Sequence, residues 1–289
     1  MPQLWGCDFT SAPSRRKPVV LAVGQLEGRA AAQRLVLSHF ETFETLHAFG
    51  ERLRLPGDWV GGFDLPFGLP RALVEALGWP TDWHACVRHY AALPRDTIRQ
   101  TFAAFCAARP VGSKFAHRAT DGPAGSSPSM KWVNPPVAFM LHAGVPLLLD
   151  AGVALPGLHP GDAANLDGGG QPRRVALEAY PGWLARRVLG ARSYKSDDRA
   201  KQNLERFIAR KDLADALEGG LVSMQPQVAL RLKWSHAQRD AVVDDASGDR
   251  LDAVLCLWQA AWALMQHQQG HPRYGLPEFD PLEGWIVGV

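Results

Sequence analysis

Acidic residues at the ends of predicted secondary-structure elements are the clearest chemical signal in this sequence. Asp64 follows the apolar run 59–63 and precedes Pro66, which has no N–H for a strand ladder, so a buried strand should end at this aspartate. Asp8 lies in an apolar first strand, where a carboxylate needs a partner or a metal. Because α/β sheets bind ligands beyond the carboxyl ends of their strands, we expect chemistry at Asp64; a helix-cap or turn role is the alternative.

A third carboxylate, Glu178, lies in the segment 173–180, whose alternating pattern is typical of a strand. Beside the strand of Asp64, this segment would add Glu178 to the same site. The alternative interpretation of Glu178 is an ion pair with the neighbouring Arg173 or Arg174.

Two more aspartates precede a long apolar helical segment, 253–265. Asp249 and Asp252 are three residues apart, so they share one face of a helix that includes them. Packed across the sheet, this helix can bring Asp252 over Asp8 and Asp64. In the alternative interpretation Asp249 is only the N-cap of the helix, with Asp252 as its capping partner.

Converging carboxylates repel one another, which raises the pKa of at least one of them in an empty site. Mg²⁺ and Mn²⁺ relieve this repulsion because they prefer carboxylate oxygens. Two such ions can activate water and stabilise the leaving oxygen of a phosphodiester. We therefore predict a site for Mg²⁺ or Mn²⁺ in which Asp8 bridges two ions and Asp64 and Asp252 complete their ligand sets. Asp249 or Glu178 would bind one ion directly or through water.

The rest of the pattern predicts the sheet that positions these acids. Strands are predicted over 4–9, 19–23, 34–43, 59–64 and 173–180, with a short final strand at 285–287. Short turns join the first three, including a turn at 24–28, which predicts an antiparallel meander. Right-handed crossovers would then place the fourth strand beside the first and the fifth beside the fourth.

A long insertion separates the fourth and fifth of these strands. Residues 79–108 have helical spacing, 111–136 form a connection rich in Gly, Ser and Pro, and a helix is predicted over 136–149. So long an irregular connection is usually functional or mobile. We therefore predict a single α/β domain, 1–289, with a mixed five-stranded sheet, flanking helices and a helical and loop insertion at 79–170.

Composition is ordinary for a globular protein, with 46% hydrophobic and 21% charged residues and a formal net charge of +2. Between Gln171 and Lys211, however, eleven Lys or Arg stand against four acids. We predict that Lys195, Arg199 and Lys201 in this stretch contact substrate phosphate. A solvated helix face is the alternative.

Other patterns bear on location. The N-terminus lacks a basic region followed by an apolar core, so no signal peptide is expected. No apolar run reaches about 18 residues, so no membrane span is expected. The four scattered cysteines are interpreted as buried free thiols in a reducing cytoplasm.

Several short motifs, in order along nearly the whole chain, carry a resemblance to a known family. They are Gly6-Cys7-Asp8, the segment 64–70, Glu178-Ala179-Tyr180-Pro181, Tyr194-Lys195 and 249–253. The chain resembles the ribonuclease-H-like superfamily and, more closely, the family called domain of unknown function 429, described as predicted nucleases of that fold. The resemblance implies a ribonuclease-H-like sheet. The long insertion departs from the family pattern.

Together these observations predict a divalent-metal-dependent nuclease or phosphodiesterase acting on DNA or RNA. Its catalytic residues would be Asp8, Asp64, Asp252 and Glu178, and its metal ligands Asp8, Asp64, Asp249 and Asp252. A non-catalytic module that binds nucleic acid or protein on the same scaffold is the alternative. An actin-like phosphoryl-transfer enzyme is disfavoured because residues 9–13 after Asp8 contain no glycine for a phosphate-binding turn.

Overall fold

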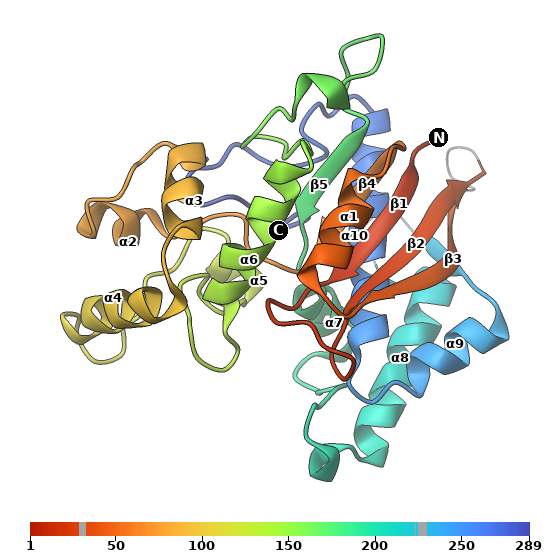
Figure 1. Cartoon of the computed structure of the whole chain (residues 1–289). Coiled ribbons are helices and arrows are strands. Elements are labelled where there is room, and N and C mark those ends of the chain that lie inside the picture. Colours follow the sequence, from red (N-terminus) through yellow and green to blue (C-terminus); the bar gives the residue numbers. More distant parts are fainter. Residues whose placement is uncertain (29–32, 223, 225–229) are drawn as a thin grey trace.

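A single mixed sheet forms the centre of the computed structural model, which describes residues 1–28, 33–222, 224 and 230–289 (Figure 1). The sheet has six strands in the order β5-β4-β1-β2-β3-β6. Their bounds are β1 Gln3–Asp8, β2 Val19–Glu27, β3 Arg34–Phe43, β4 Trp59–Phe63, β5 Arg174–Glu178 and β6 Arg231–Lys233. The predicted α/β class is confirmed, and β6 is an additional edge strand that the sequence pattern did not predict.

The strand pairing agrees with the predicted topology. β1, β2 and β3 form an antiparallel meander, β4 is parallel to β1, and β5 is parallel to β4. The turn was predicted to begin at residue 24, which is wrong. Strand β2 continues to Glu27, and its pairing with β3 shifts register between Val23 and Gly24. As a result, the carboxyl ends of β1, β4 and β5 meet at one edge of the sheet.

Ten α-helices are assigned within the described residues. They are α1 Leu46–Arg54, α2 Arg71–Ala76, α3 Trp83–Ala91, α4 Arg95–Ala107, α5 Asp121–Ala124, α6 Val137–Asp150, α7 Pro181–Leu189, α8 Leu204–Gly219, α9 His236–Val243 and α10 Asp249–Gln268. Short 3₁₀ turns, η2 and η3, cover Ala163–Asn165 and Arg199–Lys201. The helical region predicted over 79–108 is divided into α3 and α4 before Pro94, which is the N-cap of α4. In the described ranges no helix is both long and apolar enough to cross a membrane.

Two apolar layers cover the sheet. α10 packs on one face, against β1, β2 and β4, while α1 and α6 lie on the other side (Figure 1). Strand alternation assigns side chains to these layers: Leu4 belongs to the α10 layer, whereas Trp5 and Cys7 belong to the layer with α6. All four cysteines are free and buried, as predicted.

Two glycines allow α10 to approach the sheet closely. A Cβ added at Gly6 would lie 2.0 Å from the carbonyl oxygen of Ala253, and one at Gly62 would lie 2.5 Å from that of Cys256. Any larger residue in β1 or β4 at these positions would push the helix away. The start of α10 is therefore held close to the ends of β1 and β4.

The final strand predicted at 285–287 is wrong. This segment is irregular, although Val287 donates its N–H to the carbonyl of Glu178 at 2.8 Å and accepts from Gln259 Nε2 at 3.0 Å. Single contacts of this kind anchor the tail beside β5 without the repeated ladder that defines a strand.

Candidate metal centre

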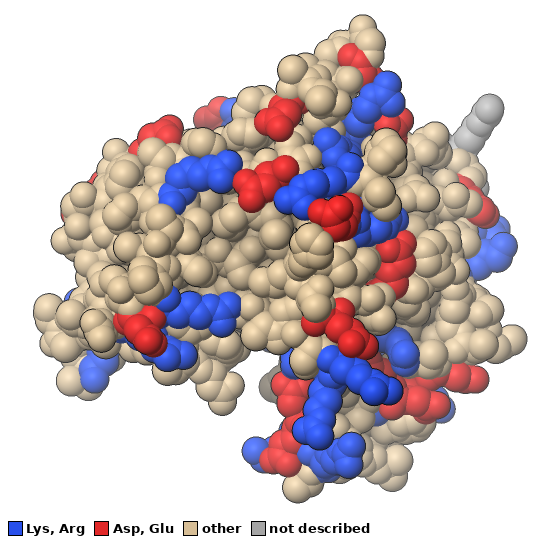
Figure 2. Space-filling view, viewed as in Figure 1, with Lys and Arg blue, Asp and Glu red and all other residues tan. Residues whose placement is uncertain are grey.

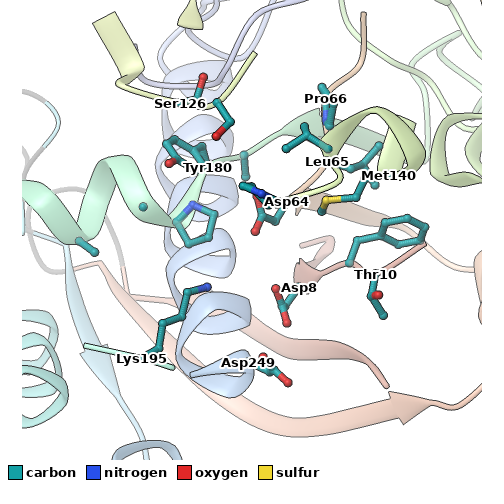
Figure 3. A pocket seen from close by; sticks show the side chains of 18 of the residues that line it. Asp8, Thr10, Asp64, Leu65, Pro66, Ser126, Met140, Tyr180, Lys195 and Asp249 are labelled. Atoms are coloured by element: carbon teal, nitrogen blue, oxygen red, sulfur yellow. The ribbon is translucent and has the colours of Figure 1, made fainter. Parts of the chain in front are cut away.

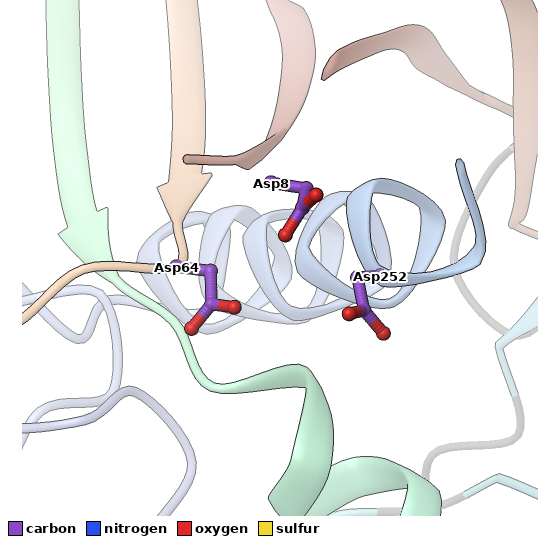
Figure 4. A group of neighbouring side chains, drawn as sticks. All are labelled: Asp8, Asp64 and Asp252. Carbon is purple, nitrogen blue, oxygen red and sulfur yellow. The ribbon is translucent and has the colours of Figure 1, made fainter. Parts of the chain in front are cut away.

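Three of the predicted carboxylates converge at the edge where the parallel strands end. Asp8 is the last residue of β1, Asp64 follows β4, and Asp252 lies in the first turn of α10. One oxygen from each lies within 4.8 Å of the others (Figure 4). Asp252 is buried, whereas Asp8 and Asp64 are partly exposed. The predicted convergence of these three side chains, here called the triad, is confirmed.

Local sequence explains the orientation of the two strand aspartates. Gly6 and Asp8 are two residues apart, so they lie on the same face of β1, toward α10. Gly62 precedes Asp64 by the same spacing, and Asp64 donates its N–H to the carbonyl of Cys7 at 2.9 Å across the strand pair. The repeated Gly-x-Asp pattern is therefore a signal of where a helix approaches, and it was available in the sequence.

The helix aspartate is fixed by its own hydrogen bonds. Gly248, in a left-handed conformation with φ 79°, is the N-cap of α10, so the alternative interpretation of Asp249 as the N-cap is wrong. Asp252 accepts a hydrogen bond from Tyr194 Oη at 2.5 Å and is paired with Lys195 Nζ. Its place in the first turn also lets the positive end of the helix dipole stabilise its charge.

The triad concentrates negative charge in a poorly solvated place. Burial raises the pKa of Asp8 well above its usual value, and the Asp252 carboxylate adds to this shift. Burial and Asp252 together raise the pKa of Asp64 to about 7. Burial opposes the charged form of Lys195, but Asp252 outweighs it and the pKa of that ammonium is raised.

This donor set fits a hard divalent cation. All three side chains of the triad offer carboxylate oxygens, the ligands preferred by Mg²⁺ and Mn²⁺. Burial and repulsion from Asp252 raise the pKa of Asp8 and Asp64, and the positive charge of a bound cation would oppose both effects. Asp8, Asp64 and Asp252 are the residues that would bind such an ion.

Asp249 lies beside this group rather than in it. Its carboxylate is 4.0 Å from Lys17 Nζ, and burial raises its pKa although Lys17 opposes the shift. Lys17 is in turn paired with Asp197 at 2.8 Å. Within the described residues, direct ligation by Asp249 therefore has less geometric support than ligation by the triad, and its role as a ligand stays a prediction.

Glu178 has a different partner from either predicted arginine. Arg118 Nη2 donates to its Oε1 at 2.7 Å and Arg118 Nη1 to its Oε2 at 2.9 Å, while the N–H of Phe67 donates to Oε2 at 2.9 Å. The predicted pairing with Arg173 or Arg174 is wrong, because Arg173 bonds Asp58 and Arg174 bonds Asn165.

Arg118 and its acidic partners form a second buried group, here called the Arg118 cluster (Arg118, Asp121 and Glu178). The guanidinium also donates to Asp121 Oδ1 from both Nε and Nη2, at 3.1 and 2.9 Å. Burial raises the pKa of Glu178, but Arg118 opposes this shift. Arg118 is 60 residues from Glu178 in sequence, so local pattern gave no sign of the pair.

The predicted phosphate contacts are dispersed. Lys195 borders the triad, whereas Arg199 and Lys201 lie on η3, outside the described lining of the adjoining cavity. Lys201 is 3.3 Å from Asp198. Figure 2 shows Lys and Arg mixed with Asp and Glu on the face it presents, rather than a uniformly basic surface. Contact of Lys195, Arg199 and Lys201 with phosphate stays a prediction.

A cavity of about 630 Å³ adjoins Asp8 and Asp64 (Figure 3). Its lining includes Met140, which the sequence did not indicate, and Tyr180 and Tyr194, which the sequence motifs contained but which were not predicted as site residues. Met140 comes from the insertion and Tyr180 precedes α7. The motif Glu178-Ala179-Tyr180-Pro181 was the sequence signal for Tyr180; Met140 had none.

No family model, curated protein or solved structure matches this chain. The resemblance to ribonuclease-H-like proteins and to the domain of unknown function 429 family stays a prediction from sequence motifs.

Proposed function

We propose that this chain is a divalent-metal-dependent phosphodiesterase that hydrolyses nucleic acid. The observation that carries the proposal is the triad, whose oxygens lie within 4.8 Å of one another beside an open cavity. A divalent cation held by Asp8, Asp64 and Asp252 would supply Lewis acidity, which lowers the pKa of water and neutralises charge on a phosphoryl group.

The side chains around the triad have separate parts in this proposal. Tyr194 and Lys195 orient Asp252, as hydrogen bonds to a metal ligand commonly do. Lys195 stays an ammonium at neutral pH because Asp252 raises its pKa. Its side chain is 42% exposed, so positive charge is available where a phosphate would enter.

The reaction would consume one water for each bond broken. The water oxygen forms a new P–O bond, one ester P–O bond breaks, and the departing oxygen takes a proton to become a hydroxyl. The products are a phosphomonoester and a free hydroxyl. The residues of the triad stay unchanged over the cycle.

Nucleic acid is the proposed substrate because basic side chains lie around the cavity. Lys17, Arg186, Arg192 and Lys195 all belong to its lining. Lys and Arg at such positions bind phosphate oxygens and fix the register of a strand. The excess of basic residues between Gln171 and Lys211 extends this charge along the chain.

Calorimetric titration with Mn²⁺ and a cleavage panel of labelled DNA and RNA test the proposal. The panel contains junctions, flaps, single strands and hybrids, each with Mg²⁺, Mn²⁺ or EDTA. We expect metal-dependent cleavage by the wild type and by Asp96→Asn, which changes a well-exposed carboxylate on α4, and none by Asp8→Asn. A stoichiometry of two would support the two-ion arrangement.

Two results would overturn the proposal. Cleavage that survives in Asp8→Asn would point to a contaminating nuclease or another site. Nucleic acid bound but not cleaved under any metal condition would instead favour the non-catalytic binding module.

A further inference from the structure

The cavity beside the triad is large enough for more than a phosphate group. Its volume of about 630 Å³ lies in the range of pockets that enclose small organic ligands, roughly 300–1,000 Å³. The insertion supplies part of its wall through Val137 and Met140 of α6 and through Ser126 and Asn134 of the connection before it. Asp8 and Asp64 therefore border a partly open cavity, here called the compartment, that the insertion helps to wall.

The compartment has chemically different ends. Asp8, Asp249 and Lys195 lie together at one end, whereas Met140 and Leu65 lie on the other side of Asp64 (Figure 3). Apolar surface next to charged groups matches a ligand with a hydrophobic body and an ionic head. A nucleotide has this form, with a flat base at one end and a phosphate at the other.

Aromatic and polar groups suited to a base also border the compartment. Tyr180 contributes a phenol ring with the Arg186 guanidinium carbon 5.3 Å from its centroid, and base–aromatic stacking on such a ring is tolerant of sequence. Ser127 and Asn134 place a hydroxyl and an amide along the same lining, where they can meet the edge of a base.

The wall of the compartment is held in place by the Arg118 cluster. Arg118 connects the insertion to Glu178 at the end of β5 and to the carbonyl of Glu283 at 3.0 Å. Nearby, Ala119 donates its N–H to Glu283 Oε2 at 2.8 Å, and Ile286 donates to Thr120 Oγ1 at 3.2 Å. These bonds fix the compartment before any ligand enters.

We infer that the compartment receives the base and sugar of one unpaired nucleotide while its phosphate lies at the triad. The inference rests on the proposed function and narrows its substrate to a nucleoside phosphate whose base is free. A base inside a duplex would first have to be extruded, at the expense of stacking and pairing. Single-stranded ends, flaps and free nucleotides provide such a base directly.

A substitution that fills part of the compartment with a larger side chain tests whether a base binds there. Met140→Trp places an indole in the space for the base, and Ala104→Trp adds the same ring on an exposed part of α4. We expect Met140→Trp to lower cleavage of single strands at least about tenfold while Mn²⁺ affinity is retained. Ala104→Trp should leave both unchanged. Equal cleavage by wild type and Met140→Trp would overturn the inference.

The second measurement compares the rates at which single-stranded, flap and closed duplex substrates are cleaved. The same labelled sequence is offered as a single strand, as a flap and as a covalently closed duplex. We expect the first two to be cleaved at least about tenfold faster than the closed duplex. Equal rates on the closed duplex would overturn the inference while leaving the proposed phosphodiesterase intact.

Binding of adenosine 5′-monophosphate tests the nucleotide compartment separately from phosphodiester cleavage. It also distinguishes a free nucleotide from a nucleotide within a strand as the natural ligand. If no phosphodiester is cleaved, the proposed function fails, and calorimetry with this nucleotide decides the inference. The inference is supported if the wild type binds the nucleotide and Met140→Trp weakens this binding at least about tenfold. It is overturned if the wild type binds neither the nucleotide nor a single strand. Tighter binding of the free nucleotide than of a strand identifies the monomer as the natural source.

Discussion

The triad and the Arg118 cluster are two groups of buried or partly buried acids at the same edge of the same sheet. The triad lies at the ends of β1 and β4, and Glu178 of the Arg118 cluster lies at the end of β5, the next strand. In the Arg118 cluster a guanidinium bonds both carboxylates, and the Phe67 N–H and the Ser126 hydroxyl add further donors. In the triad, the Tyr194 hydroxyl and the Lys195 ammonium both donate to the same residue, Asp252.

The two groups therefore differ in how completely the same side-chain types are paired. Buried carboxylates with a full set of donors hold their charge without a further ligand. Asp8 and Asp64 lack such donors in the described structure, and burial raises the pKa of both. The degree of charge compensation, rather than residue type or position on the sheet, distinguishes the triad and supports its proposed role as a cation site.

Replacing Arg118 by an uncharged residue should have the largest effect on the stability of the protein. Arg118→Met leaves Glu178 and Asp121 buried without their partner, which should lower the free energy of unfolding by about 3–5 kcal/mol. Urea unfolding measures this loss. Arg118→Met combined with Glu178→Gln should cost less than the two changes added, and strict additivity would show that the pair is not coupled.

Removing an acid from the triad should have the opposite effect on the metal-free protein. Asp8→Asn removes one repelling charge, so stability in EDTA should hold or rise modestly. The gain from Mn²⁺ at about 100 times its dissociation constant, about 2.7 kcal/mol for the wild type, should disappear. Thermal melting with Mn²⁺ and with EDTA checks both. A variant that gains as much from Mn²⁺ as the wild type would show that Asp8 is not a ligand.

The pH dependence of stability should also distinguish the triad. The folded-state pKa of Asp64 is about 7, above its unfolded value near 4, so its contribution is fully present below pH 4 and is lost as pH rises through 7. Metal-free wild type should therefore lose about 2–3 kcal/mol more than Asp64→Asn between pH 5 and pH 8. Urea unfolding in EDTA at both pH values measures the difference, and equal losses would contradict the raised pKa.

Removing one hydrogen bond to Asp252 should weaken metal binding less than Asp8→Asn does. Tyr194→Phe removes the hydroxyl that donates to Asp252 and keeps the ring. Loss of a hydrogen bond to a metal ligand typically weakens affinity about 10–100-fold, and we expect the lower end because Lys195 remains. Calorimetry with Mn²⁺ measures the change. Unchanged affinity would indicate that Lys195 alone orients Asp252.

The smallest effect is expected from charges outside both groups. Reversal of Arg199 and Lys201 to Glu, in an Asp252→Asn background that binds without cleaving, should lower affinity for oligonucleotides. The salt slope should also fall, by roughly 0.7–0.9 for each phosphate that the protein no longer neutralises. Titration of labelled single and double strands at three salt concentrations measures both. No change would support a solvated helix face for this stretch.

Much of the fold could be predicted from local sequence. Strand alternation and the proline after Asp64 predicted where β1 and β4 end, and short turns predicted the meander. Crossover handedness then predicted that β4 lies beside β1 and β5 beside β4. The edge strand β6 was missed because it is three residues long and pairs only with the distant β3.

Local sequence predicts which acids stand at strand ends, and Gly6 and Gly62 indicate where a helix can approach them. Which of these acids is neutralised depends on contacts that form only in the folded chain. Arg118 reaches Glu178 across 60 residues of sequence, and Lys195 reaches Asp252 across 57. Periodicity and turn chemistry act over a few residues, whereas charge compensation depends on distance and burial in the folded chain, so no local pattern could distinguish the triad from the Arg118 cluster.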